Sequence, residues 1–339
     1  MLKGVAVVVS AAAILLSVFH FGAKEEPLKI GYSDWPGWVA CEVAAQKGWF
    51  EEAGVNVQLI WFEYGPSLEA FAAGNVDAVS MTNGDAMVLG ASGKHSKAVV
   101  INDYSNGNDM VIGRPGITSV ADLKGKKVGV ELNLVDHLLL LQALAAHGLE
   151  ESDVTLVNMP TNDTPQALAA RGVDAIAAWN PIAAQTLEQV PGSQPLFTSR
   201  EVPGLIFDAL FVDAGSLATR KEDWEKVASV WFRVVDYIKN PVTQGDAVAI
   251  MSARVGTTPE RYQRFLDGTY LLDLPGNLRA FEDGTSLASI FGSSATVNRF
   301  NVAKKVYDVS QDPRAYFDVG LVRNLSSSEA LSGAAAAAP

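Results

Sequence analysis

Short apolar runs alternate with stretches of helical periodicity in the first third of the chain, and glycines close several of those stretches. Four runs are short, apolar and bounded by turn residues, and they predict strands at Leu28–Tyr32, Val55–Phe62, Ala78–Met81 and Ala98–Asn102. The intervening stretches predict helices at Val39–Gly48, Pro66–Ala73 and Ala86–Ala91. This β-α-β-α order is typical of a largely parallel sheet with helices on both faces.

A second unit of the same kind begins near Gly113. Its predicted strands are Lys126–Val130, Val154–Asn158 and Ala175–Trp179, and its predicted helices are Val135–His147, Thr164–Arg171 and Pro181–Gln189. Leu205–Val212 predicts a strand that returns to the first unit. The remainder predicts helices at Lys221–Lys239, Gln244–Arg254, Pro259–Leu266 and Asn277–Phe291. We therefore predict an α/β fold with two lobes, each a mostly parallel sheet flanked by helices, and a hinged cleft between them.

These patterns set the expected boundaries. We assign residues 27–112 together with 206–325 to the first lobe, and residues 113–205 to the second. In residues 1–23, Lys3 precedes the uncharged run Gly4–Ala23, which predicts a secretory signal or, if it is retained, a membrane anchor. Either outcome places the rest of the chain in the periplasm or elsewhere outside the cytoplasm. Residues 326–339 are mainly Ser, Ala and Gly and predict a disordered tail.

Composition narrows the function classes. The chain has 339 residues, of which 48% are hydrophobic, and its 38 Asp and Glu against 26 Lys and Arg give a net charge of −12. That charge argues against nucleic acid or an anionic membrane surface as a partner. The single cysteine, Cys41, and four scattered histidines offer no metal-ligand spacing. We find no nucleophile–base pair or phosphate loop, so we expect no catalysis, cofactor or metal. We also expect the protein to be a monomer.

Acidic residues gather in the segments that follow predicted strands. Seven such segments contain no Lys or Arg but hold Asp34, Glu63, Asp85, Asp103, Glu131, Asp136 and Asp208. In open α/β sheets, ligands bind beyond the carboxyl ends of the strands. A cleft lined in this way attracts a small cation or a hydrogen-bond donor and repels an anion.

Aromatic and amide side chains occur in the same segments and complete the candidate site. A flat cation is held well by a carboxylate in its plane and an aromatic ring on its face. The candidate ligand-binding residues are Asp34, Trp35, Trp38, Asn83, Asp85, Asp103, Tyr104, Glu131, Asp136, Trp179 and Asp208. Each has a structural alternative, because acids cap helices and aromatic rings pack in cores. Asp208 needs a partner in either case, since its run is otherwise apolar.

Several motifs carry a family resemblance. They are "KIGYSDWPGWVACEVAAQKGWFEEAGVNVQ" (29–58), "FAAGNVDAVSMTNGD" (71–85), "SVADLKGKKVGVE" (119–131) and "LAARGVDAIAAWNP" (168–181). Together they resemble the substrate-binding proteins of the nitrate, sulfonate and taurine class of ABC importers, over residue 29 to about 308. The resemblance implies a two-lobed periplasmic-binding-protein fold that captures a small molecule by cleft closure and delivers it to a membrane permease.

The ligand follows from the branch of that class and from the charges. The segments "YSDWPGW", "MTNGDA", "NDYSNGNDM" and "ELNLVDHLLL" resemble the branch associated with guanidine and urea utilisation. The expected ligand is a small, nitrogen-rich planar cation, with guanidinium first. The alternatives are urea or another neutral amide, a nitrate, sulfonate or taurine anion, a thiamine-precursor pyrimidine binder or enzyme of the same scaffold, and a ligand sensor for a membrane regulator.

Overall fold

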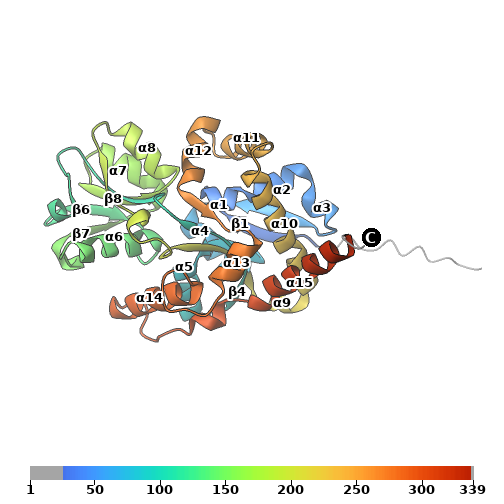
Figure 1. Cartoon of the computed structure of the whole chain (residues 1–339). Coiled ribbons are helices and arrows are strands. Elements are labelled where there is room, and N and C mark those ends of the chain that lie inside the picture. The colour runs from blue at the N-terminus through green and yellow to red at the C-terminus, as the bar shows by residue number, and fades with distance from the viewer. Residues whose placement is uncertain (1–25, 337–339) are drawn as a thin grey trace, which may run out of the picture.

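The structure is a computed structural model that describes residues 26–336, and two mixed sheets organise it (Figure 1). The six-stranded sheet has the order β11-β4-β10-β3-β1-β2. Its strands are β1 (Leu28–Tyr32), β2 (Val57–Trp61), β3 (Ala78–Thr82), β4 (Ser96–Ser105), β10 (Phe207–Asp213) and β11 (Thr269–Leu271). We call the part of the molecule built on this sheet lobe 1.

The five-stranded sheet has the order β7-β6-β8-β5-β9 and forms lobe 2. Its strands are β5 (Asp109–Gly113), β6 (Lys127–Val130), β7 (Thr155–Asn158), β8 (Ala175–Trp179) and β9 (Gln194–Thr198). β5 pairs with β8 and β9, so residues 109–112 belong to this sheet although we assigned them to the first lobe. The strands β5, β9 and β11 were not predicted.

The predicted α/β class is confirmed, but the sheets are less parallel than expected. β1 pairs in parallel with β2 and β3, and β6 does so with β7 and β8. Every pair that involves β5 or β10 is antiparallel, because these strands enter their sheets from the opposite end after the chain has crossed between lobes. As a result, their first residues lie at the edge where the parallel strands end.

Short helices follow the strands of lobe 1: α1 (Pro36–Val39), α2 (Cys41–Lys47), α3 (Trp49–Glu52), α4 (Tyr64–Ala72) and α5 (Asn83–Ala91). The single helix expected over 39–48 is divided at Ala40. Gly48 ends α2 in the left-handed conformation (φ 71°), which glycine adopts without strain. Cys41 opens α2 beside the core, and burial raises the pKa of its thiol to about 12.

Lobe 2 carries α6 (Val135–Ala146), α7 (Thr164–Ala169) and α8 (Ile182–Gln189). Nine of the twelve residues of α6 are buried, which accounts for its almost continuous apolar sequence. The 3₁₀ turns are η1 (Val120–Leu123), η2 (Glu151–Asp153), η3 (Thr161–Asp163), η4 (Ser199–Glu201) and, in the C-terminal region, η5 (Pro313–Tyr316).

Helices dominate after β10: α9 (Ala214–Thr219), α10 (Lys221–Lys239), α11 (Gln244–Arg254), α12 (Pro259–Asp267), α13 (Leu274–Ala280), α14 (Ile290–Ala303) and α15 (Val319–Ala336). The helix expected at Asn277–Phe291 is wrong: α13 ends at Ala280, and α14 starts after Ser289, whose side chain caps it. The intervening Glu-Asp-Gly-Thr-Ser sequence favours turns over helix. α15 runs through Ala336, into the stretch for which we expected no regular structure.

The chain crosses between the lobes at residues 106–108 and again before β10. Ser105 Oγ and Ser199 Oγ, at the two crossings, are 2.6 Å apart and hydrogen-bonded. The predicted signal or anchor at 1–23 lies outside the described residues. Within the described part, none of the helices combines the length and apolar character needed to cross a bilayer.

Candidate functional site

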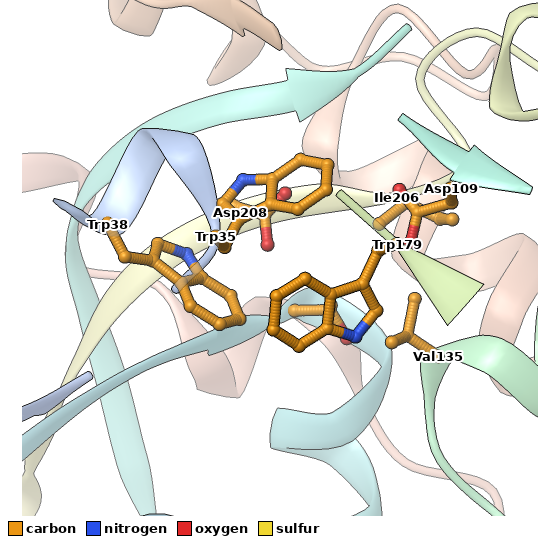
Figure 2. A pocket seen from close by; sticks show the side chains of 8 residues that line it. Trp35, Trp38, Asp109, Val135, Trp179, Ile206 and Asp208 are labelled. Atoms are coloured by element: carbon orange, nitrogen blue, oxygen red, sulfur yellow. The ribbon is translucent and has the colours of Figure 1, made fainter. Parts of the chain in front are cut away.

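A small cavity lies where the edges of the two sheets meet (Figure 2). Its free volume is about 10 Å³, room for no more than a single water molecule. Both lobes and a crossing segment contribute its lining residues, which are Trp35, Trp38, Thr82, Asp109, Val135, Trp179, Ile206 and Asp208. The sheet register explains the assembly, because Asp208 pairs with Thr82 and with Asp103 in lobe 1, while Asp109 pairs with Trp179 in lobe 2.

Four aromatic rings surround this cavity. Trp38 stacks on Tyr64 with centroids 5.2 Å apart, and both rings belong to lobe 1. Trp179 approaches from lobe 2 and lies 6.2–6.3 Å from the rings of Trp35, Trp38 and Tyr64. All four side chains are buried. The rings therefore exclude water and present π faces across the boundary between the lobes.

One buried aspartate of lobe 1, Asp208, lines the cavity, and a second, Asp103, adjoins it. Asp103 Oδ1 accepts a hydrogen bond of 3.0 Å from Trp35 Nε1, while Oδ2 has no partner. Asp208 lines the cavity, and its Oδ2 is also unpartnered. Burial raises the pKa of Asp208 well above its usual range, and the charge of the adjacent Asp103 raises it further. Burial likewise raises the pKa of Asp103 to about 8.

Asp85 connects the lobes. Thr82 caps α5 by accepting from the backbone amide of Asp85, so the Asp85 carboxylate is free for other partners. Its Oδ2 accepts a 2.6 Å hydrogen bond from Tyr64, and the backbone amide of Val135 in lobe 2 also donates to the carboxylate. Burial still raises the pKa of Asp85 to about 7.

Lobe 2 supplies Asp109 and Asp136. Each has one carboxylate oxygen without a partner. Asp136 Oδ2 accepts a hydrogen bond of 2.5 Å from Thr161 Oγ1. Burial raises the pKa of Asp109 to about 7 and that of Asp136 well above its usual range, and the negative charge of Asp85 raises both pKa values further.

Five carboxyl groups are thus collected with no basic partner. Asp85, Asp103, Asp109, Asp136 and Asp208 are at most 3% exposed. Among the described residues that line the cavity, none is Lys or Arg. Buried carboxylates normally require a cation or hydrogen-bond donors, and an unpaired one costs several kcal/mol. Burial instead raises the pKa of each of these carboxyl groups, which favours the protonated form.

The structure places Asp34 elsewhere. Its Oδ1 accepts a 2.7 Å hydrogen bond from Trp61 Nε1, and the charge of Arg254 lowers its pKa against the larger effect of burial, which raises it. Asp34 precedes Trp35 directly, and only Trp35 is among the cavity-lining residues.

Three other predicted residues lie outside the cavity. Asn83 donates to Ser293 and Ser294 and accepts from the backbone of Phe207, so it fastens lobe 1 internally. Tyr104 stacks on Tyr270, with centroids 4.7 Å apart, beside a separate groove. Glu131 lies in a groove at the edge of the cleft and accepts from Thr161.

Sequence reasoning missed four of the cavity-lining residues and the adjoining Tyr64; the four are Thr82, Asp109, Val135 and Ile206. Asp109 opens an apolar strand, as Asp208 does, and that shared pattern was the available signal. Tyr64 follows β2 but was not among the candidates. Its ring stacks on Trp38 and its hydroxyl donates to Asp85.

Two α/β lobes with a cavity between them form the periplasmic-binding-protein fold. The protein is structurally similar to the periplasmic aliphatic sulphonate binding protein SsuA from Escherichia coli, with a TM-score of 0.71 and 19% identity, covering 88% of this chain and 99% of that one. It is also similar to the periplasmic nitrate-binding protein NrtA from Synechocystis PCC 6803, with a TM-score of 0.70 and 12% identity, covering 89% and 88%.

The sequence identifies the family. Residues 22–252 match the model of the NMT1-like family, and the chain belongs to that family. A Brucella abortus protein whose name marks it as an assumed binding protein is 34% identical over 193 residues, which is 56% of this chain. The match spans 60% of that relative's length. The family match and the structural neighbours together confirm the predicted resemblance to the nitrate and sulfonate class of binding proteins.

Proposed function

We propose that this protein is an extracytoplasmic solute-binding protein of an ABC importer that captures a small planar cation, with guanidinium as the best candidate. One observation carries the proposal: five buried aspartates lie close to one another in the cleft, and two of them, Asp109 and Asp208, line a cavity walled by aromatic rings, with no Lys or Arg among its described lining residues. A resident cation is the usual neutraliser of such a cluster. Here a ligand would fill that role.

Guanidinium suits this arrangement for three reasons. It is flat, so the rings of Trp35, Trp38 and Trp179 can face it and contribute cation–π attraction of about 0.5–2 kcal/mol per contact. It carries only N–H donors, and the site offers unpartnered acceptor oxygens on Asp109 and Asp208. It is small, so a slight separation of the two lobes would admit it.

An organic cation fits better than a metal ion. Within residues 26–336, no three or more His, Cys, Asp or Glu side chains come together as a set that could hold a metal. Aromatic walls also offer no ligand to a hard metal cation.

The importer role rests on the family and its relatives. Structural neighbours of this protein include periplasmic sulphonate- and nitrate-binding proteins. By the same logic, the closed form of this protein would dock on a membrane permease outside the cytoplasm. The acidic cavity is opposite in charge to what a sulfonate or nitrate requires, so the ligand differs while the transport role is shared.

Urea is the second candidate, and one observation favours it. Trp38 Nε1 is a buried donor without a partner at the cavity wall. The carbonyl oxygen of urea could accept from it, whereas guanidinium has no acceptor. Urea leaves the carboxylates without a counter-charge, so its affinity should depend little on pH, while the affinity for guanidinium should rise with pH.

Isothermal titration calorimetry tests the proposal. The protein is titrated with guanidinium chloride, urea, taurine and nitrate in parallel at low ionic strength. We expect submillimolar or tighter binding of guanidinium and no heat from either anion. Tight binding of taurine or nitrate would overturn the cation proposal, and binding of urea alone would replace guanidinium by a neutral amide.

A further inference from the structure

We propose that Asp85 and Glu131 form a reciprocal latch across the cleft, in which each carboxylate covers the N-terminus of a helix in the opposite lobe. We further propose that Gly65 is the residue that allows this latch to close. The inference rests on the proposed function, because it concerns how the same cleft shuts around its ligand.

The first half of the latch lies at the start of α6 in lobe 2. Its N-cap residue, Leu134, cannot supply a side-chain cap, so the first backbone N–H groups of α6 need an external acceptor. Asp85 of α5 in lobe 1 lies beside this helix start, since Asp85 and Leu134 line the same small cavity, and the Val135 amide lowers the pKa of the Asp85 carboxyl group. A carboxylate in this position is favoured by the positive end of the helix dipole.

The second half runs in the opposite direction. α4 of lobe 1 starts after Glu63, whose side chain makes no capping hydrogen bond. Glu131 of lobe 2 reaches this helix at Gly65, where a Cβ atom would overlap Glu131 Oε1. A side chain at position 65 would therefore require the Glu131 carboxylate to move from its place.

Glu131 has little freedom to move aside. Its other oxygen, Oε2, accepts from Thr161 Oγ1 at 2.9 Å and from the Thr161 amide at 3.3 Å. Thr161 Oγ1 also contacts Asp136 at the start of α6. On the lobe 1 side, Tyr64 opens α4 and donates to Asp85. The contacts therefore form a closed circuit through both helix starts.

The latch also bears on specificity. A helix N-terminus is a ready anion site when its amides face a cleft. Here the two helix starts beside the cavity are covered by the protein's own carboxylates, so an anionic ligand meets negative charge instead. The latch thus joins closure to the preference for cations.

The test uses the substitution Gly65→Ala with Gly245→Ala as a matched control. Gly65 is the second residue of α4, and Gly245 is the second residue of α11, where a Cβ meets no atom within 4 Å. Alanine favours helix at both positions, so neither variant should lose thermal stability. We expect Gly65→Ala to weaken guanidinium binding about tenfold, because the closed form would have to move the Glu131 carboxylate away from the start of α4. Gly245→Ala should bind as the unaltered protein does.

A second background makes the test specific to Glu131. In a Glu131→Ala protein the obstruction is gone, so adding Gly65→Ala should weaken binding no further. Unchanged affinity in the Gly65→Ala protein, or an equal loss in both backgrounds, would overturn the latch.

Hydrogen exchange at the Val135 amide decides the latch without any ligand. In the ligand-free protein we expect this amide to be protected, and to exchange faster in Gly65→Ala than in Gly245→Ala. Equal exchange in all three proteins would overturn the latch. Failure of the unaltered protein to bind guanidinium would overturn only the cation proposal, because the exchange comparison stands on its own.

Discussion

The protein binds several of its own arginine guanidinium groups, and the surroundings of one of them, that of Arg254, can be compared with the cleft. Arg254 Nε donates to Tyr32 Oη at 2.7 Å and contacts Glu42 Oε1 at 3.3 Å. Its Cζ lies 5.4 Å from the ring centroid of Tyr32 and 5.8 Å from that of Trp61. Carboxylates and aromatic faces thus hold this resident cation in lobe 1, close to the protein surface.

The cleft repeats those components without the cation. It has carboxylates, tryptophan rings and a tyrosine, but its acids are far more buried and their oxygens are partly unpartnered. The Arg254 guanidinium group is the counter-charge of Glu42, and it also lowers the pKa of Asp34. The difference teaches that acidity alone does not mark a ligand site. The informative feature is acidity that the protein leaves unsatisfied.

The sharpest way to break this comparison is to neutralise one acid in each region. Asp208→Asn should weaken guanidinium binding about hundredfold, because removing one buried charged partner costs roughly 2–5 kcal/mol. Asp34→Asn should change the affinity by less than about threefold, since its partners are Trp61 and Arg254. Calorimetry of both variants measures the contrast, and equal losses would remove the distinction between the regions.

Aromatic walls offer a second contrast. Trp179→Ala should reduce guanidinium affinity about thirtyfold, because it removes a desolvated ring face worth about 2 kcal/mol. Trp61, which is 40% exposed and hydrogen-bonds Asp34, serves as the control. Its substitution by Ala should leave the affinity nearly unchanged. Fluorescence titration with competing buffer salts held constant measures both, and an unaffected Trp179→Ala protein would exclude that ring from the site.

The pH dependence of binding should differ between the regions as well. Burial raises the pKa of Asp85 and Asp109 to about 7 and that of Asp103 to about 8. A bound cation favours their ionised forms, so guanidinium affinity should fall about tenfold between pH 8 and pH 6 as these groups take up protons. Calorimetry in buffers of different ionisation enthalpy should show proton release on binding at pH 7. A flat profile would instead point to a neutral ligand.

Stability of the ligand-free protein should change in the opposite sense. These carboxyl groups have higher pKa values folded than unfolded, so the folded state holds more protons between about pH 4 and pH 8. Their contribution therefore destabilises the protein progressively as pH rises through that window. Differential scanning calorimetry should show a lower melting temperature at pH 8 than at pH 6. Low concentrations of guanidinium should raise the melting temperature more at pH 8 than at pH 6.

The smallest expected effect is on the resident cation. Arg254→Gln should lower the free energy of unfolding by about 1 kcal/mol, the scale of a partly exposed ion pair. Guanidinium affinity should stay within about threefold of its original value. Urea unfolding at matched pH measures the first quantity and calorimetry the second. A large loss of affinity would mean that the two regions are coupled.

Much of the fold could be predicted because strand and helix periods are local properties. β1 and β8 match their predicted bounds, and α6 ends within one residue of prediction. The failures occur where pairing depends on distant residues. β5 becomes a strand by pairing with β8 and β9, which lie far from it in the sequence, and β9 does so by pairing with β5. The strand β11 has three residues, too few for a pattern to be recognised.

The site was predicted in part for the same reason. Acids near the ends of predicted strands, such as Asp85 and Asp103, could be placed at one sheet edge from strand order alone, although β4 extends past Asp103 to Ser105. Asp109 could not, because it reaches that edge only through the antiparallel entry of β5. Asp34 has the same local pattern as its neighbours, and only the tertiary position of Arg254 shows that its charge is already used.

The lone thiol of this chain gives the molecule a practical property. Cys41 is held against the core of lobe 1, and burial keeps its pKa near 12, so it is almost entirely un-ionised at neutral pH and a poor nucleophile. A second cysteine introduced on the surface could therefore be alkylated selectively without first removing the native one. A fluorophore attached in this way on one lobe near the cleft edge would make the protein an optical sensor of its own ligand.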